Sequence, residues 1–166
     1  MIARLLPQPV TSLLIAGLWI TLHPGAGAGT ALLAVLLGLG LPLLIQRFWP
    51  SPPRLVRPLV ALRLVLVVLA DIVSANFVVA AQVLGPPARL RPAHFTVPLD
   101  IGDPFVATLL GGIISLTPGT VTIDIEVIDG QARRLFVHGL DVPDADAAAA
   151  AIKARYEAPL KEMFRC

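Results

Sequence analysis

Two strongly apolar stretches occupy the beginning of the chain. Residues 5–22 and residues 30–46 contain no charged side chain. Each is close to the roughly 17 to 25 residues that a helix needs to cross a hydrocarbon core of about 30 Å. The connecting residues 23–29 are rich in glycine and contain neither Lys nor Arg. This pattern predicts a transmembrane helical hairpin within residues 1–57.

Basic residues flank this hairpin at its two ends. Arg4 precedes the first stretch, and a run from Arg47 to Arg57 follows the second. Because cytoplasmic loops of membrane proteins carry an excess of Lys and Arg, both ends of the hairpin are expected in the cytoplasm. A secretory signal peptide is the alternative for the first stretch, since a basic residue, an apolar run and small residues near Ala26 follow its usual order. The second apolar stretch follows directly, which favours the hairpin.

Polar side chains interrupt the third apolar segment, residues 58–84. These are Arg63, Asp71, Asn76 and Gln82. A charge inside the membrane costs about 2.5 to 3.5 kcal/mol on insertion scales. A helix that lies in the cytoplasmic interface, or is only partly embedded, avoids this cost and keeps the following residues in the cytoplasm. We therefore favour an interfacial or partly embedded helix, with a third full span as the alternative.

Asp71 and Asn76 are the two candidate functional residues of this segment. An ionisable residue at membrane depth suggests a direct part in proton or cation movement. The other interpretation of Asp71, which we favour, is that it pairs with a basic group or with a neighbouring subunit at the interface. For Asn76 the expected role is a hydrogen bond in helix–helix packing.

A turn and a strand organise the second half of the chain. Pro118 fixes φ near −65°, and Gly119 accepts the positive φ that a type II turn requires next. From Thr120 onward polar and apolar residues alternate, which is the period of a half-buried strand. Its buried face would hold Val121, Ile123, Ile125 and Val127.

The remaining elements of this half follow from local signals. They are a strand at 94–99, a helix beginning at Asp103-Pro104, strands at 120–128 and 133–140 joined by Asp129-Gly130, and a helix from Asp141 or Asp144 to Phe164. This β-α-β-β-α order is that of a ferredoxin-like domain that lacks its last strand. The crossover rule sets the first strand parallel to the third. The first strand is then an edge strand, where Pro98 is tolerated. Pro159 is expected to kink or fray the last helix.

Composition divides the chain in the same way. Hydrophobic residues make up 56% of the chain and charged residues 14%. Residues 1–90 contain six basic residues and one acidic residue, whereas residues 91–166 contain seven basic and ten acidic residues. We expect a hairpin at 1–57, a third helix and linker at 58–87, and a small α+β cytoplasmic domain at 88–166. The basic residues lie beside apolar segments, which favours a lipid bilayer over nucleic acid as the partner.

The sequence contains no residue pattern typical of an enzyme. Cys166 is the single cysteine, and neither a Ser/His/Asp, a Cys/His nor a metal-ligand spacing occurs. We therefore expect no catalytic residue, no cofactor and no bound metal. His138, near the end of the third strand, is expected to be a hydrogen-bonded structural residue rather than a ligand or a base.

Several short motifs are typical of one family of membrane proteins. They are Ala75-Asn76, Val83-Leu84, Leu116-Thr-Pro-Gly-Thr120 running into Val121-Thr-Ile-Asp-Ile125, Val137-His138, Leu140 and Asp141. With these motifs the chain resembles, over nearly its full length, the E subunit of the Mrp-type multisubunit Na⁺(K⁺)/H⁺ antiporters of bacteria.

The resemblance implies an integral subunit of the bacterial plasma membrane that works in pH homeostasis. Its partners would be the other subunits of a hetero-oligomer, both large subunits similar to complex I proton pumps and small membrane subunits. The implied role is assembly, with helix contacts at small residues such as Gly17, Gly38 and Gly40. The turn residues Leu116, Thr117, Pro118, Gly119 and Thr120 would fix the helix of the soluble domain against its sheet. A membrane-anchored adaptor that binds a soluble partner is the alternative.

Overall fold

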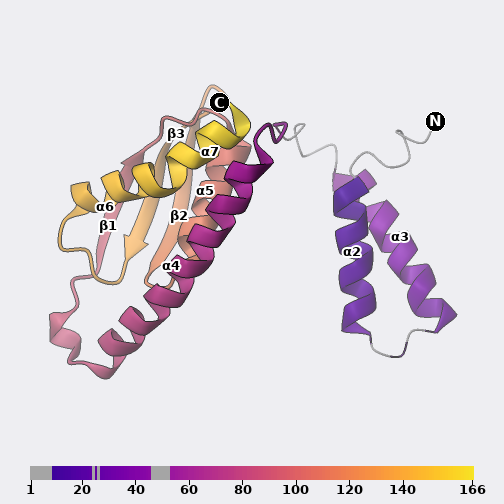
Figure 1. The fold of residues 1–166 in the computed structure, drawn as a ribbon, viewed down its shortest axis with the longest axis horizontal. Helices are drawn as coiled ribbons and strands as arrows, with labels where there is room; N and C mark the ends of the chain where they lie inside the picture. The colour runs from indigo at the N-terminus through magenta and orange to yellow at the C-terminus, as the bar shows by residue number, and fades with distance from the viewer. Residues whose placement is uncertain (1–8, 24, 26, 46–52) are drawn as a thin grey trace. The chain divides into compact units, whose positions relative to one another are not determined.

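The computed structural model describes residues 9–23, 25, 27–45 and 53–166. The chain forms two compact units, residues 1–52 and residues 53–166 (Figure 1). Arg4, Arg47 and Ala26, on which the predicted orientation and the signal-peptide alternative depend, lie outside the described residues.

The first unit contains the helices α2 (Pro9–Leu22) and α3 (Ala28–Ile45), which run antiparallel (Figure 1). Gly38 lies at their contact, where an added Cβ would come 2.9 Å from the carbonyl oxygen of Ser12. Gly17 and Gly40 face open space. The hairpin therefore uses Gly38 for its close approach and leaves the other two glycines exposed. By length and composition α3 can cross a membrane.

The second unit begins with α4 (Pro58–Leu84), a continuous helix of 27 residues. It is long and apolar enough to cross a membrane by length and composition. One face of it nevertheless contributes to a protein core, since Leu64 is 6% exposed and Val68 is 8% exposed. The opposite side carries exposed large apolar residues such as Leu62 and Leu66. The short 3₁₀ turn Pro87–Arg89 then leads into the α+β domain.

Three strands form an antiparallel sheet in the order β1-β3-β2. They are β1 (Ala93–Pro98), β2 (Thr120–Ile128) and β3 (Gln131–Gly139). The predicted hairpin turn is confirmed, because Asp129 and Gly130 both have positive φ, 51° and 74°. β1 is an edge strand, as predicted from the absence of a fourth strand.

The predicted parallel pairing of the first and third strands is wrong. β1 is antiparallel to β3, with His94 opposite His138 in the register. The crossover through a helix returns β2 parallel to β1, but one strand position away from it. β3 arrives by the hairpin and fills the gap between them, so it is antiparallel to both. The crossover rule therefore applies to β1 and β2, which do not pair directly.

The helices cover one face of the sheet. α5 (Pro104–Leu116) packs on β2 and α6 (Ala145–Ile152) packs on β1. A carboxylate caps each helix start: Asp103 accepts hydrogen bonds from two backbone amides of α5, and Asp144, not Asp141, does the same for α6. The fully buried core side chains between these layers include Val97, Ile101, Val106, Leu110, Leu135 and Val137.

The last helix passes Pro159 without ending. After α6 comes a π turn (Lys153–Glu157) and then α7 (Ala158–Phe164). The amide of Ala158 bonds to the carbonyl of Lys153, five residues back. Pro159 has no N–H for the carbonyl four residues before it, and the extra residue of the π turn accommodates this loss. The expected disturbance at Pro159 is thus a local widening of the helix.

The predicted buried face of β2 is also wrong for most of its residues. Val121, Ile123 and Val127 are 46%, 55% and 47% exposed. Instead, Thr122 faces α5, and its hydroxyl donates a hydrogen bond of 2.9 Å to the carbonyl of Gly111. A shift in register between Thr122 and Asp124 inserts one extra residue and restores Ile125 to the core side.

Candidate functional site

A cleft of about 380 Å³ separates α4 from the α+β domain. Asp71 and Gln82 line it from α4, the turn at residues 117–120 lines it from the end of α5, and Arg155 and Tyr156 line it from the π turn. Residues from three distant parts of the sequence therefore meet here. Asp71 and the turn, both candidates from the sequence, lie in the same cleft.

The turn has the geometry that its sequence predicts. The amide of Thr120 donates a hydrogen bond of 3.3 Å to the carbonyl of Thr117, and Gly119 has a φ of +92°. A Cβ on Gly119 would lie 3.2 Å from the Cγ2 atom of Val79 in α4. Glycine is therefore favoured twice, by backbone conformation and by the close approach of α4. The carbonyl of Gly119 also accepts a hydrogen bond of 2.8 Å from the amide of Leu140 after β3.

Two threonine hydroxyls close the end of α5. The Oγ1 atom of Thr117 donates to the carbonyl of Ile113 at 3.1 Å, and that of Thr120 donates to the carbonyl of Ile114 at 2.8 Å. These carbonyls belong to the last turn of the helix, where regular helical partners run out. The carbonyl of Ile114 also accepts a hydrogen bond of 3.2 Å from the amide of Thr117. Leu116, by contrast, is 63% exposed. The polar residues of the motif, and not its leucine, connect the helix to the sheet.

Asp71 is held by a two-point ion pair and a phenol. The Nε atom of Arg155 donates to Asp71 Oδ2 at 2.6 Å, and a second guanidinium nitrogen contacts Oδ1. The hydroxyl of Tyr156 donates to Oδ2 at 2.8 Å. Hydrogen bonding to Asp71 raises the pKa of Arg155, and burial together with the same carboxylate raises the pKa of Tyr156. Both donors therefore keep their protons over the physiological range.

A second ion pair lies at the other end of the cleft. Arg91 donates to Asp141 from its Nε atom at 2.9 Å, and Gln82 of α4 approaches the same carboxylate at 3.5 Å. The hydrogen bond from Arg91 lowers the pKa of Asp141. Sequence reasoning did not select Arg91, Arg155 or Tyr156. The one sequence signal for this site was the pair Arg155-Tyr156, two adjacent hydrogen-bond donors on the last helix. Nothing in the sequence indicated that their acceptor is Asp71.

The other two candidates lie away from the cleft. Asn76 is five positions after Asp71, which is about 140° around the helix. It is exposed, and its side chain donates to the carbonyl of Ile72 at 2.7 Å. His138 lies against His94 across the β1–β3 pair, with ring centroids 4.6 Å apart. The Nδ1 atom of His138 is buried and has no hydrogen-bond partner in the described part of the chain.

Comparison with known proteins identifies the family. A family model described as a Na⁺/H⁺ ion antiporter subunit matches residues 12–163. The chain belongs to this family. Similar proteins include the E1 subunit of the Na⁺/H⁺ antiporter of Staphylococcus haemolyticus, 27% identical over 156 residues, 94% of this chain and 96% of that protein. The corresponding E subunit of Bacillus subtilis is 25% identical over 158 residues, 95% of this chain and 98% of that protein. The resemblance to antiporter E subunits that the sequence motifs indicated is confirmed.

A solved structure shares the fold of this antiporter family member. It is a chain of the membrane-bound sulfane sulfur reductase, an archaeal respiratory membrane complex. The TM-score is 0.65 and the identity 23%, over 98% of this chain and 99% of the other. Family membership and the two long apolar helices, α3 and α4, support a membrane location.

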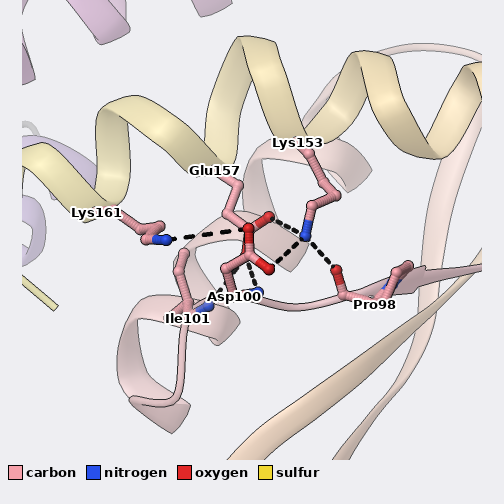
Figure 2. A network of polar contacts seen from close by, with 6 residues as sticks. All are labelled: Pro98, Asp100, Ile101, Lys153, Glu157 and Lys161. Carbon is pink, nitrogen blue, oxygen red and sulfur yellow. Dashed lines mark hydrogen bonds and ion pairs between the residues drawn. The ribbon is translucent and has the colours of Figure 1, made fainter.

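A buried carboxylate connects the π turn of this protein to the end of β1 (Figure 2). Glu157 is 1% exposed, and its Oε1 atom accepts hydrogen bonds from the amides of Asp100, at 2.6 Å, and Ile101, at 3.0 Å. Lys153 Nζ lies 3.2 Å from Glu157 Oε2 and donates to the carbonyl of Pro98 at 2.7 Å. A hydrogen bond from Lys153 lowers the pKa of Asp100. The π turn therefore presents Arg155 and Tyr156 to α4 and Glu157 to the domain.

Proposed function

We propose that this chain is the E subunit of a multisubunit monovalent cation (Na⁺)/proton antiporter of the bacterial plasma membrane, and that it supports assembly rather than ion movement. Its partners are the large and small membrane subunits of the same complex. Membership of the antiporter subunit family supports the first part. The second part, a role in assembly, is supported by the hydrogen bonds that Arg155 and Tyr156 donate to Asp71.

A carboxylate that relays protons or cations has to exchange its charge partner during each cycle. Asp71 is instead matched by a guanidinium fork and a hydroxyl, and its side chain is only 17% exposed. Removing the charge from Asp71 would leave Arg155 without its counter-ion inside the cleft. This arrangement favours a clamp that holds α4 on the α+β domain. We therefore interpret Asp71 as a structural residue.

The packing of α4 supports an interfacial rather than a spanning helix. Leu64 and Gln82, both on the domain side of α4, are 18 residues apart, which is about 27 Å along the axis. If α4 crossed the bilayer, the domain and its ion pairs would lie in hydrocarbon over most of this length. A helix in the cytoplasmic interface places its exposed leucines in lipid and the domain in the cytoplasm. The β-α-β-β-α order and the strand order β1-β3-β2 support a ferredoxin-like domain without its last strand.

The assembly role is tested by purifying the tagged complex in a gentle detergent and measuring its exchange activity in vesicles. Asp71→Asn is expected to reduce the amount of complete complex, and activity per assembled complex should stay near that of the wild type. A complex that assembles in full but exchanges no cation would instead make Asp71 part of the ion path. Recovery of the chain with one soluble protein alone would support the adaptor alternative.

The orientation is tested with Cys166, the single cysteine of the sequence. A membrane-impermeant maleimide should label it in inverted vesicles and not in right-side-out vesicles. The matched control carries Gly27→Cys, in the exposed hairpin connection, on a Cys166→Ser background. That cysteine should react from the opposite side. Labelling of both positions from the same side would exclude the proposed topology.

A further inference from the structure

A second groove, of about 410 Å³, runs between α4 and the helix that follows the π turn. Val60, Arg63 and Val67 form its wall on α4, and Ala158, Pro159 and Glu162 form the opposite wall. The groove is thus mainly apolar, with charged groups along it. Arg155 lies between this groove and the cleft that contains the turn at residues 117–120, and it lines both.

The charges around this groove do not cancel. α4 contains two ionisable residues, Arg63 and Asp71, and Asp71 is neutralised by Arg155. Glu162 of the groove is neutralised by Arg57, which contacts its carboxylate directly. Arg63 has no acidic partner among the described residues 53–166. The groove therefore carries one uncompensated positive charge.

Arg63 occupies the boundary between the two faces of α4. It is three positions before Leu66, which is 59% exposed, and four before Val67, which packs partly against the domain core. Residues at these spacings are neighbours on a helix surface. The guanidinium can therefore extend from the groove to the edge of the apolar outer face. A long basic side chain in this position typically reaches the headgroup level of a bilayer.

We propose that this groove binds an anionic phospholipid, with the phosphate at Arg63 and an acyl chain against the apolar walls at Val60, Val67 and Pro159. The guanidinium fork matches a phosphate with two parallel hydrogen bonds. The excess positive charge selects a headgroup with net negative charge over a zwitterionic one. The apolar walls continue into the exposed outer face of α4, which selects a lipid over free phosphate. The inference rests on the interfacial position of α4 in the proposed function.

The test is lipid retention by the full chain, purified in detergent and incubated with an equal mixture of phosphatidylglycerol and phosphatidylcholine. Native mass spectrometry counts the lipids that stay bound. The wild type is expected to retain phosphatidylglycerol in preference, and Arg63→Gln should reduce this retention roughly fivefold. Arg133→Gln is the matched control, because Arg133 is an exposed arginine of β3 outside the groove. An excess of inorganic phosphate should displace little of the lipid.

A second variant tests the groove rather than the charge. Ala158→Phe leaves Arg63 in place and fills the space between the walls, so retention should fall here too. Equal retention by Arg63→Gln and Arg133→Gln, equal binding of both lipids, or full retention by Ala158→Phe would overturn the proposal. Displacement of the lipid by inorganic phosphate or by an acidic peptide would also do so. The maleimide labelling of Cys166 tests the interfacial topology independently. A failure of the lipid proposal can therefore be distinguished from a failure of the proposed function.

Discussion

Asp71 of α4 and Arg155 of the π turn are 84 positions apart in the sequence and form a two-point ion pair. Together with the phenol of Tyr156, this pair connects α4 to the α+β domain. The nearby turn at residues 117–120 contacts the same helix through Gly119 and Val79. The two contacts explain how an otherwise apolar helix keeps one defined face toward the domain.

The Asp71–Arg155 pair should stabilise the second unit measurably. Arg155→Gln leaves the carboxylate with Tyr156 alone, and because the Arg155 side chain is 54% exposed the loss is expected to be about 1 to 2 kcal/mol. Thermal unfolding of the full chain in detergent measures the change. Arg133→Gln removes an equal charge without breaking a described ion pair and should change stability little. A double-mutant cycle with Asp71→Asn that gives no coupling would contradict this prediction.

Gly119 should tolerate substitution less well than the other positive-φ glycine of this domain. Gly119→Ala combines a φ of +92° with a Cβ only 3.2 Å from Val79, whereas Gly130→Ala has a φ of +74° and open space around it. The cost of placing alanine at a positive φ, about 1 kcal/mol, is common to both variants. The loss of unfolding free energy should therefore be larger for Gly119→Ala, and Val79→Ala should recover the difference. Equal losses would show that the contact with α4 is unimportant.

The hydroxyl of Thr120 should matter more than that of an exposed threonine on the preceding helix. Thr120→Val leaves the carbonyls of Ile114 and Thr117 without this donor and is expected to cost about 1 to 2 kcal/mol. Thr108→Val is the control, since the Thr108 hydroxyl also donates to a helix carbonyl, that of Pro104, but is exposed. Urea unfolding of the two variants under identical conditions gives the comparison. A similar loss in both would assign no special role to the turn.

The Arg91–Asp141 pair should make stability depend on pH on the acid side. The hydrogen bond from Arg91 lowers the pKa of Asp141 from 3.8, so the folded state binds its proton less tightly than the unfolded state. The stabilisation is therefore present above about pH 4 and is lost as the pH falls through the lowered pKa. Asp141→Asn should melt below the wild type at pH 7, and the two should converge at low pH. Asp129→Asn, at the hairpin turn, is the control, because Asp129 takes part in no ion pair within the described part of the chain.

Gly38 should be required for the close packing of the helical hairpin. Gly38→Ala places a methyl group 2.9 Å from a backbone carbonyl and 3.2 Å from the side chain of Ala16, which is tighter than helices accommodate without moving apart. The expected cost of such overpacking is about 1 to 3 kcal/mol. Gly40→Ala adds the same methyl group into open space and serves as the control. Disulfide trapping between cysteines introduced on α2 and α3 measures the separation, which should change only in the first variant.

The sequence by itself determined the elements whose causes lie within a few residues. The apolar stretches predicted α3 and α4, Asp103 marked one helix start, and Pro118-Gly119 and Asp129-Gly130 specified their turns. The start of the last helix was narrowed to Asp141 or Asp144, and the structure has Asp144. Each of these signals is local, because a cap or a turn is formed by neighbouring backbone groups. The family resemblance was visible for the same reason, since its motifs are mostly these short segments.

The tertiary structure alone decided the contacts between distant residues. Strand pairing depends on where a crossover helix returns the chain, which is why β1 lies antiparallel to β3 against expectation. Thr122 faces the core in place of Val121 and Ile123, because its hydroxyl is bonded to Gly111, and the bulge after Thr122 returns Ile125 to the core side. Asp71 had many possible basic partners in the sequence. Only the packing of α4 on the π turn brings Arg155 within hydrogen-bonding distance of it, because the geometry of a fold, not the order of its residues, sets such distances.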